Sequence, residues 1–273
     1  MGIFSEKHIN PKYSLITVNF RSASALGRMF RSLPSDFFLE GEVLIVNNDN
    51  DESNFLAKMF QEKDRVSILE TGKNVGFSRA CNHGALVAQG EILVFLNPDV
   101  QFDPPSFWLW LKDVSQNTKV ISAPTLLQCG SEEPWSSGII VSPWSILLQN
   151  IFPFSRMWSF FGEKSLGWVS GAAFAMRKTE FHYLGGFDER YFLYYEDVDL
   201  GYRAKKEGFR IQRHREVYFL HRGGLSHTEG KEKQKQTYFH SQDQYIREHY
   251  GFIWSCLLRF FRSCRFVFSR IVC

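Results

Sequence analysis

Apolar runs and amphipathic segments alternate over the first hundred residues of the chain. The apolar runs are rich in β-branched and aliphatic residues and predict strands at residues 13–20, 43–46, 66–69 and 91–96. The segments between them carry apolar residues at helical spacing and predict helices around residues 26–33, 55–60 and 77–89. Strands that alternate with helices in this way predict an α/β fold with a parallel sheet and right-handed crossovers.

The alternation weakens after residue 99. A helix is predicted at residues 107–114, and strand-like stretches recur at residues 120–127, 166–176, 209–211 and 217–220. The stretch at 166–176 has small residues in its middle, which allow either close approach of a ligand or tight strand packing. Residues 128–165 show no sustained period, so we expect an irregular, partly mobile insertion over the site.

The last part of the chain predicts two helices of different character. Residues 230–250 are polar, whereas residues 252–273 form a basic and aromatic amphipathic pattern. On a helical wheel the basic side carries Arg259, Arg262, Arg265 and Arg270, and the apolar side carries Ile253, Trp254, Leu257, Phe260, Phe261, Cys264, Val267, Phe268 and Ile271, with Leu258 and Phe266 out of pattern. Such a helix favours an anionic membrane surface, and the alternative is a helix packed on the protein with solvated arginines. We expect one main domain over residues 1–228 and a helical extension over residues 229–273.

The net charge of +3 hides an uneven distribution along the chain. Residues 1–200 carry 17 Lys and Arg against 23 Asp and Glu, a balance of −6, whereas residues 201–273 carry 15 against 6, a balance of +9. A basic end on an acidic body indicates an anionic partner. A stripe of arginines is weak evidence for nucleic-acid binding when the chain shows no known nucleic-acid-binding fold. We therefore expect no nucleic-acid partner.

The cysteine pattern and the hydropathy of the chain restrict the cellular compartments in which the protein is expected. The five cysteines form no CxxC pair, so neither a zinc site nor a disulfide framework is predicted. The first 13 residues lack the apolar core of a secretory signal, and no run of about 20 apolar residues occurs. We therefore expect a cytoplasmic protein that lies on the inner face of the cytoplasmic membrane.

Five carboxylates fall within a dozen residues among aromatic side chains, at Asp188, Glu189, Glu196, Asp197 and Asp199. Aromatic surroundings lower the local dielectric constant, which raises the pKa of a carboxyl group and makes the carboxylate a better base. A helical pattern starts at Asp197, so Glu196 and Asp197 are expected at a helix N-terminus, where negative charge is favoured. The alternative is an N-cap with a surface ion pair between Asp199 and Arg203.

Polar loops follow three of the predicted parallel strands, at residues 47–51, 72–76 and 97–99. Ligands of parallel sheets bind at the carboxyl ends of the strands, where these loops meet. A proline presets the turn that presents Asp99, and one carboxylate there can hold a divalent cation that bridges a diphosphate. His221 ends another predicted strand and is a further ligand, a phosphate contact or a structural histidine.

Five short strings, spread over about residues 12–228, carry the strongest functional signal. They are Lys73–Gly84; Leu96–Asp99; Trp168–Ala172; Gly186–Glu189 with Tyr195–Leu200; and His221 with Gly223, Gly224 and Ser226. In this order they resemble the family 2 glycosyltransferases, and among these the bacterial rhamnosyltransferase-like members. The resemblance implies a GT-A fold, with a mixed and mostly parallel sheet flanked by helices, and an inverting transfer from a nucleotide-diphospho-sugar.

The resemblance also implies roles for individual residues. Asp99 would bind Mg²⁺ or Mn²⁺ with His221 as the second protein ligand, and Asp197 would be the catalytic base with Glu196 in reserve. The nucleotide-sugar would be bound by Asn47, Asp49, Asn74, Gly76, Arg79, Asn82 and Asn97. The sugar and acceptor pocket would include Trp168, Gly171, Ala172 and Asp188. Asn47 stands where the family usually has an acid that contacts the nucleobase, and Asp49 is the residue that can compensate.

The function that the resemblance favours is transfer of L-rhamnose from dTDP-rhamnose to a lipid-linked oligosaccharide in cell-surface polysaccharide synthesis, of the O-antigen or capsule type. One alternative keeps the fold and mechanism but uses a UDP-sugar, with galactofuranose, N-acetylglucosamine or another hexose. Another is a catalytically silent protein that binds glycans or membranes, which the joint presence of Asp99, Asp197 and His221 disfavours. A dehydrogenase is disfavoured because no GxGxxG string follows the first predicted strand.

Overall fold

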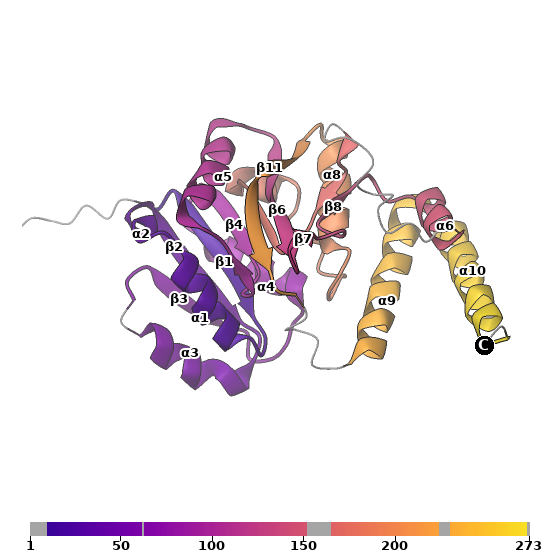
Figure 1. The fold of residues 1–273 in the computed structure, drawn as a ribbon, viewed down its shortest axis with the longest axis horizontal. Coiled ribbons are helices and arrows are strands. Elements are labelled where there is room, and N and C mark those ends of the chain that lie inside the picture. The colour runs from indigo at the N-terminus through magenta and orange to yellow at the C-terminus, as the bar shows by residue number, and fades with distance from the viewer. Residues whose placement is uncertain (1–9, 62, 152–164, 224–229, 272–273) are drawn as a thin grey trace, which may run out of the picture.

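The computed structural model describes residues 10–61, 63–151, 165–223 and 230–271. Within them a nine-stranded sheet runs in the order β3-β2-β1-β4-β10-β6-β11-β5, and β7 pairs with β6 (Figure 1). These strands are β1 (Tyr13–Asn19), β2 (Gly41–Asn47), β3 (Val66–Glu70), β4 (Ile92–Leu96), β5 (Val100–Gln101), β6 (Val120–Gln128), β7 (Ser131–Glu132), β10 (Ala173–Arg177) and β11 (Arg210–His221). A separate two-stranded ladder joins β8 (Ser137–Gly138) to β9 (Trp168–Val169).

The sheet is mixed and mostly parallel. β1 pairs parallel with both β2 and β4, and β2 pairs parallel with β3, so the four strands predicted in the first hundred residues form one parallel half. β10 runs antiparallel to β4 and to β6, whereas β6 and β11 pair parallel. The predicted α/β class is confirmed, and the polar loops after β2 and β4 lie at the same edge of the sheet.

The described helices either cover the two faces of the sheet or lie beyond it. They are α1 (Ala23–Ser32), α2 (Phe37–Glu40), α3 (Ser53–Phe60), α4 (Phe77–Val87), α5 (Pro104–Gln116), α6 (Pro143–Ile151), α7 (Lys178–Tyr183), α8 (Glu196–Lys206), α9 (Lys231–Tyr250) and α10 (Phe252–Ile271), with a 3₁₀ turn at η1 (Asn50–Glu52). α6, α9 and α10 lie together at one end of the molecule, beyond α8 (Figure 1).

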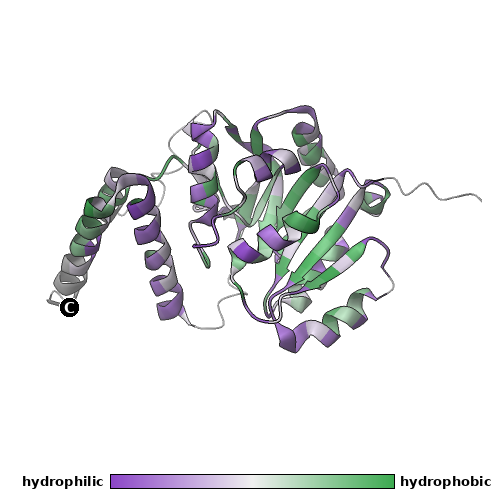
Figure 2. Cartoon of the chain, turned by 180° about the vertical axis from the view of Figure 1, so that it is seen from behind, coloured by the Kyte–Doolittle hydropathy of each residue, from purple (hydrophilic) through white to green (hydrophobic). Residues whose placement is uncertain are grey.

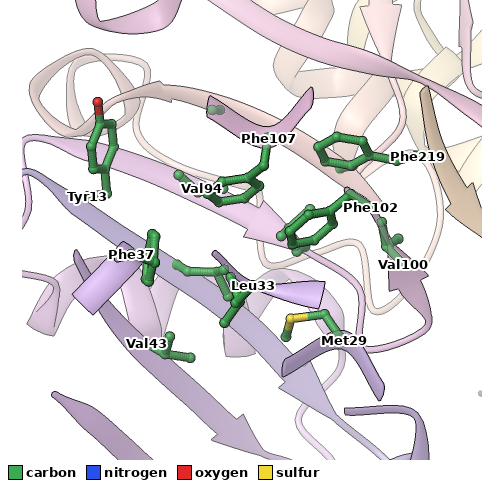
Figure 3. Packing of buried hydrophobic residues seen from close by; sticks show 14 of the residues in the cluster. Tyr13, Met29, Leu33, Phe37, Val43, Val94, Val100, Phe102, Phe107 and Phe219 are labelled. Atoms are coloured by element: carbon green, nitrogen blue, oxygen red, sulfur yellow. The ribbon is translucent and has the colours of Figure 1, made fainter. Parts of the chain in front are cut away.

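The hydrophobic core has two parts because strand side chains alternate between the two faces of the sheet. On one face Val43 and Val94 pack against helical aromatics that include Phe37 and Phe107 (Figure 3). The buried residues on the other face include Ile16, Leu44, Phe95, Phe174 and Phe187. Strands that are buried on both faces have nearly continuous apolar sequences, which explains why β1, β2 and β4 were predictable from their composition.

Two strand predictions are wrong in detail. Residues 166–176 form two strands in different sheets, β9 and β10, because the chain turns through Ser170–Ala172. The stretches at 209–211 and 217–220 fall in one long strand, β11, whose pairing with β6 shifts register between His214 and Tyr218. The unpaired residues at this irregularity interrupt the period-2 alternation, so the sequence pattern shows two short strands where the backbone forms one.

The prediction of an irregular insertion at residues 128–165 is wrong for its first half. This half contains β7, β8 and α6, and β7 continues the main sheet as an antiparallel neighbour of β6. Residues 152–164 lie outside the described part of the chain, so the mobility predicted for them stays a prediction. Gly224 and Ser226, from the last of the five strings, also lie outside it.

Helix α10 covers Phe252–Ile271 of the predicted residues 252–273. Leu258, which breaks the wheel pattern, is 1% exposed and is buried together with Ser255. Arg262 points toward α9, where its guanidinium lies 2.6 Å from an Asp243 oxygen and over the ring of Phe239. The side chains of the apolar stripe remain exposed at Ile253, Leu257, Phe260 and Phe261. Among the described helices none has both the length and the hydropathy needed to cross a bilayer.

Candidate active site

A cavity of about 620 Å³ opens at the carboxyl ends of the strands, between the sheet and α9. Its lining brings together the side chains predicted to carry the chemistry: Asp99, Glu196, Asp197 and His221, with Glu133 as an addition. A second hollow of about 550 Å³ beside α2 and α5 contains none of the predicted site residues. The first cavity is therefore the candidate active site.

Strand pairing places Asp99 and His221 side by side. β5 begins directly after Asp99 and pairs with the end of β11, so that His221 lies opposite Val100. The carbonyl of Asp99 accepts the backbone N–H of Arg222 at 3.2 Å, and the Asp99 Oδ1 and His221 Nε2 atoms are 3.5 Å apart. Both side chains are largely buried but line the cavity. The predicted pairing of these two residues at the strand ends is thus present in the structure.

Two donors of this kind suit a divalent cation that also binds phosphate. Carboxylate oxygen is a hard ligand preferred by both Mg²⁺ and Mn²⁺, and a neutral imidazole nitrogen is a common second ligand of protein-bound metals. Over the described ranges no cluster of three or more His, Cys, Asp or Glu side chains is arranged to hold a metal alone. A cation that takes only one or two protein ligands and completes its shell with diphosphate oxygens and water fits this donor set.

Glu133 was not among the predicted site residues. It follows β7, and its Oε2 lies 2.8 Å from His221 Nδ1. Burial lowers the pKa of His221, but hydrogen bonds to Asp99 and Glu133 and their charges outweigh this and raise the pKa to about 10. This arrangement favours a proton on both ring nitrogens, and a metal that bound Nε2 would displace one of them. Only the pair of acids at Glu132 and Glu133 hinted at this in the sequence, in a stretch without periodicity.

Asp197 lines the same cavity from the start of α8. Its Oδ2 accepts the backbone N–H of Gly171 at 2.9 Å, and its Oδ1 accepts that of Val198 at 2.8 Å. Burial raises the pKa of Asp197 more than these backbone hydrogen bonds lower it. The carboxyl group is thus held in a fixed orientation and is a stronger base than an exposed aspartate.

The turn that presents Asp197 is conformationally unusual. Tyr194 and Tyr195, directly before α8, both have left-handed backbone angles, with φ of 68° and 69°. Such angles in residues with a Cβ cost on the order of 1–3 kcal/mol each and concentrate at functional sites. The Tyr195 hydroxyl accepts a hydrogen bond from Gln242 of α9 at 2.7 Å, so the C-terminal helices help to hold this turn.

Glu196 has a different environment from Asp197. It is 5% exposed, and its Oε2 has no hydrogen-bond partner in the described residues. Burial and the neighbouring charge of Asp197 raise the pKa of Glu196 well above its ordinary value. This environment favours the protonated carboxylic acid, which cannot accept a proton, so the geometry favours Asp197 over Glu196 as the base.

Asp199 is not part of a surface ion pair, contrary to the alternative drawn from the sequence. It is 1% exposed and bonds to both Arg203 and His249 at 2.7 Å. Arg203 also donates to the carbonyls of Leu184 and Gly186. Asp199 therefore fixes α8 to the glycine-rich turn before it and to α9.

Four of the predicted binding residues line the cavity or its rim: Asn97, Trp168, Gly171 and Ala172. Asn74 and Gly76 form the turn before α4, where the Asn74 side chain accepts the Gly76 N–H at 3.0 Å. Gly76 has φ of 87°, and a Cβ there would lie 2.8 Å from the Phe192 ring. Glycine is thus required at this turn by both backbone angle and space.

The other predicted binding residues bond within the protein and lie outside the cavity lining. Asn47 is fully buried and bonds to Asn19, Ser53 and Glu70, and Asp49 caps the η1 turn. Arg79 pairs with Glu189, Asn82 bonds to the backbone of Phe187, and Asp188 pairs with Arg190. These contacts hold the loops at the strand ends in place, and the assignment of these side chains to ligand binding stays a prediction.

Comparison with known proteins identifies the family. Residues 14–179 match the family described as Glycosyl transferase family 2. The chain is 26% identical over 256 residues to the N-acetylglucosaminyl-diphospho-decaprenol L-rhamnosyltransferase of Mycobacterium tuberculosis, covering 85% of this chain and 82% of that one. It is 24% identical over 183 residues to the rhamnosyltransferase WbbL of Escherichia coli strain K12, covering 61% of this chain and 68% of that one.

Solved structures with the same architecture support the fold assignment. GalNAc-T7 with UDP, GalNAc and Mn²⁺ superposes with a TM-score of 0.63 at 12% identity and covers 89% of this chain. The mannosyltransferase PcManGT from Pyrobaculum calidifontis, with GDP-Man and Mn²⁺, superposes with a TM-score of 0.60 at 15% identity and covers 88%. The chain spans only 48% and 64% of the lengths of these two proteins. The predicted GT-A fold is confirmed, and the chain belongs to glycosyl transferase family 2 as a rhamnosyltransferase-like glycosyltransferase.

Proposed function

We propose that this protein is an inverting, metal-dependent rhamnosyltransferase that uses dTDP-L-rhamnose and a lipid-linked glycan acceptor. The observation that carries the proposal is that Asp99, His221 and Asp197 open into one cavity. The name of the Mycobacterium tuberculosis relative describes transfer of L-rhamnose to a diphospho-decaprenol-linked sugar, which supports the donor sugar and the acceptor class. The same geometry would serve a UDP-sugar donor, which is the alternative. The product would enter cell-surface polysaccharide synthesis of the O-antigen or capsule type.

The proposed reaction assigns one task to each wall of the cavity. Asp197 accepts the proton of the acceptor hydroxyl while that oxygen forms a bond to the anomeric carbon. The bond from this carbon to the diphosphate breaks, and the electron pair leaves with dTDP. Asp99 and His221 would hold Mg²⁺ or Mn²⁺, which when bound neutralises charge on the leaving diphosphate. The backbone N–H of Gly171 keeps the Asp197 carboxylate aimed at the acceptor.

Nucleotide selectivity distinguishes the proposed donor from the alternative. With Mn²⁺ present, dTDP is expected to raise the Tm more than UDP does at the same concentration, because a ligand that binds only the folded state stabilises it more as its Kd falls. Turnover of dTDP-rhamnose should exceed that of UDP-galactofuranose and UDP-N-acetylglucosamine with an extract of lipid-linked acceptors. Stronger stabilisation by UDP would select the alternative donor, and no stabilisation by either nucleotide with metal would contradict the enzyme proposal.

The exposed surface of α6 and α10 supports a location on the inner face of the cytoplasmic membrane. We call this surface the α6–α10 face; its exposed apolar side chains are Trp144, Leu148, Phe252, Ile253, Leu257, Phe260 and Phe261. The two helices meet where the rings of Trp144 and Trp254 stack edge to face at 5.2 Å. Figure 2 shows hydrophobic residues along the coloured part of α10, beside the mostly hydrophilic α9. Residues 252–273 contain four arginines and no acid, which suits anionic headgroups.

The cavity and the α6–α10 face are close along the chain. Val141 lines the cavity and lies two residues before α6, and its carbonyl accepts hydrogen bonds from Tyr245 and Tyr250 of α9. A membrane bound to this face would therefore lie near the entrance through which a lipid-linked acceptor reaches Asp197.

Replacing Leu257 and Phe260 together by Asp is expected to weaken binding to phosphatidylglycerol-containing vesicles by about tenfold or more, because each side chain contributes about 1.5–3 kcal/mol on burial. Cosedimentation with vesicles measures this. The matched control replaces Leu39 and Leu86 by Asp; these two leucines lie on α2 and α4 and are 73% and 72% exposed, against 41% for Leu257 and 63% for Phe260. Equal binding by the two double variants, or no vesicle binding by the unaltered protein, would contradict the membrane assignment.

A further inference from the structure

The side chain of Glu133 is built into the wall that carries the proposed metal ligands. β6 pairs parallel with β11 and antiparallel with β7, so the β6–β7 hairpin brings Glu133 beside the end of β11. The Glu133 carboxylate lies 2.8 Å from Nδ1 of His221. Both side chains are largely buried, at 17% and 12% exposure, so the hydrogen bond is shielded from water.

The backbone of Glu133 is held on both sides. Its N–H donates to the carbonyl of Leu126 at 2.9 Å, which continues the β6–β7 pairing. Its own carbonyl accepts the N–H of Ser136 at 3.2 Å and the Ser136 hydroxyl at 2.9 Å. The position of the carboxylate is therefore set by a closed turn on the main sheet rather than by a free loop.

The two nitrogens of His221 face different partners. A carboxylate can only accept, so Nδ1 donates its N–H to Glu133. Nε2 faces Asp99 Oδ1 at 3.5 Å across the cavity wall. A histidine whose Nδ1–H is held by a carboxylate keeps one ring orientation, and a metal that displaces the proton of Nε2 would find that nitrogen already directed into the site.

Direct metal binding by Glu133 is the competing interpretation. The described residues contain no group of three His, Cys, Asp or Glu side chains arranged around one point, so Asp99, His221 and Glu133 do not form a three-ligand site. The short contact to Nδ1 also occupies the Glu133 carboxylate on the side of the ring away from Nε2. The contacts favour an indirect role.

We propose that Glu133 is a positioning residue that orients His221 for divalent metal binding, which rests on the metal-dependent function proposed above. Its carboxylate fixes the imidazole ring and raises the electron density at Nε2. Outer-shell carboxylates of this kind typically contribute about 10–100-fold to metal affinity. The first half of the 128–165 insertion then has a defined task, since its hairpin supplies this carboxylate.

The test measures Mn²⁺ affinity in the presence of dTDP, or of UDP if that nucleotide binds better, from the electron paramagnetic resonance signal of free Mn²⁺. Glu133→Ala is expected to weaken Mn²⁺ binding about 10–100-fold. Glu133→Gln should retain most of the affinity, because the amide oxygen still accepts the Nδ1–H. Glu132→Ala is the matched control: this neighbouring carboxylate is exposed, pairs with Arg213 and should leave Mn²⁺ affinity unchanged.

A double-mutant cycle separates the two roles. If Glu133 acts through His221, Glu133→Ala has no further effect on Mn²⁺ affinity in a His221→Ala background. Additive losses, or equal losses in Glu133→Gln and Glu133→Ala, would show direct ligation and overturn the proposal. Unchanged Mn²⁺ affinity in Glu133→Ala overturns it as well. Absence of Mn²⁺ binding by the unaltered protein with either nucleotide would remove the metal-dependent function itself.

Discussion

Asp197→Asn is expected to lower kcat by about 10²–10⁴-fold, the usual contribution of a general base, while Mn²⁺ and nucleotide affinity stay unchanged. The amide keeps the shape of the side chain and can still accept the N–H of Gly171 through its oxygen. It cannot take up the proton of the acceptor hydroxyl. Single-turnover measurements with saturating donor and acceptor, together with calorimetric titration of the nucleotide, separate the chemical step from binding.

Glu196→Gln is the matched control because it makes the same chemical change one residue away. Activity should remain near that of the unaltered protein, since the structure favours Asp197 as the base. A larger loss of kcat in Glu196→Gln than in Asp197→Asn would reverse the assignment of the two acids.

The same control variant should also be more stable than the unaltered protein. Burial and the charge of Asp197 raise the folded-state pKa of Glu196 well above 4.5. Glu196 therefore leaves the free energy of unfolding unchanged below its unfolded-state pKa, where it is protonated in both states. Above that pKa it lowers the free energy of unfolding, increasingly so as the pH approaches the folded-state pKa. The gain in Tm in Glu196→Gln should increase as the pH rises above about 4.3, the pKa of an unfolded glutamate, as differential scanning calorimetry would measure.

Asp99→Asn is expected to remove most metal-dependent nucleotide binding. Loss of an outer-shell partner already costs about 10–100-fold in metal affinity, so loss of one of two protein ligands should cost about a hundredfold or more. Activity should fall with it, because the diphosphate then leaves without charge neutralisation. Titrations with dTDP in the presence and in the absence of Mn²⁺ measure the effect. The two dTDP affinities should differ in the unaltered protein and be nearly equal in Asp99→Asn.

Asp103→Asn provides the control for this substitution. Asp103 is the N-cap of α5 and accepts the N–H of Ser106 at 2.9 Å, a role that asparagine fills equally well. Nucleotide binding by Asp103→Asn should still depend on Mn²⁺. If Asp99→Asn also keeps that dependence, the metal site lies elsewhere.

The sequence was sufficient for the architecture where each strand is buried on both faces. Residues such as Ile45 and Val94 lie in apolar runs that the sheet buries completely, and the helices between them have clear periodicity. Loops after parallel strands must meet at one edge, so the position of Asp99 followed from topology alone. The family motifs added Asp197 and His221, which the structure brings into the same cavity.

The sequence was insufficient where a charged side chain has its partner far along the chain. Asp199 looked like half of a local ion pair because the pattern shows Arg203 but not His249, which is 50 residues away. Arg262 looked solvated on a helical wheel for the same reason, since its partner Asp243 lies on another helix. A helical wheel distinguishes the apolar side of a helix from the polar side, but it does not show which side packs against the protein.

Glu133 illustrates the limit most clearly. β7 has only two residues and β8 likewise, so neither produces a detectable alternation in sequence. Glu133 reaches His221 because of the register of the β6–β7 hairpin and the position of the end of β11, 88 residues later. Short strands of this kind are fixed by tertiary pairing rather than by local propensity.

The central claim is that a metal held by Asp99 and His221 faces a base at Asp197 across one bound donor. A crystal structure of the Asp197→Asn variant with Mn²⁺ and dTDP-rhamnose tests it most directly. We expect anomalous density for Mn²⁺ between Asp99 and His221, with the anomeric carbon turned toward residue 197 and room for one hydroxyl between them. Mn²⁺ bound away from Asp99, or a sugar whose anomeric carbon faces away from residue 197, would contradict the account.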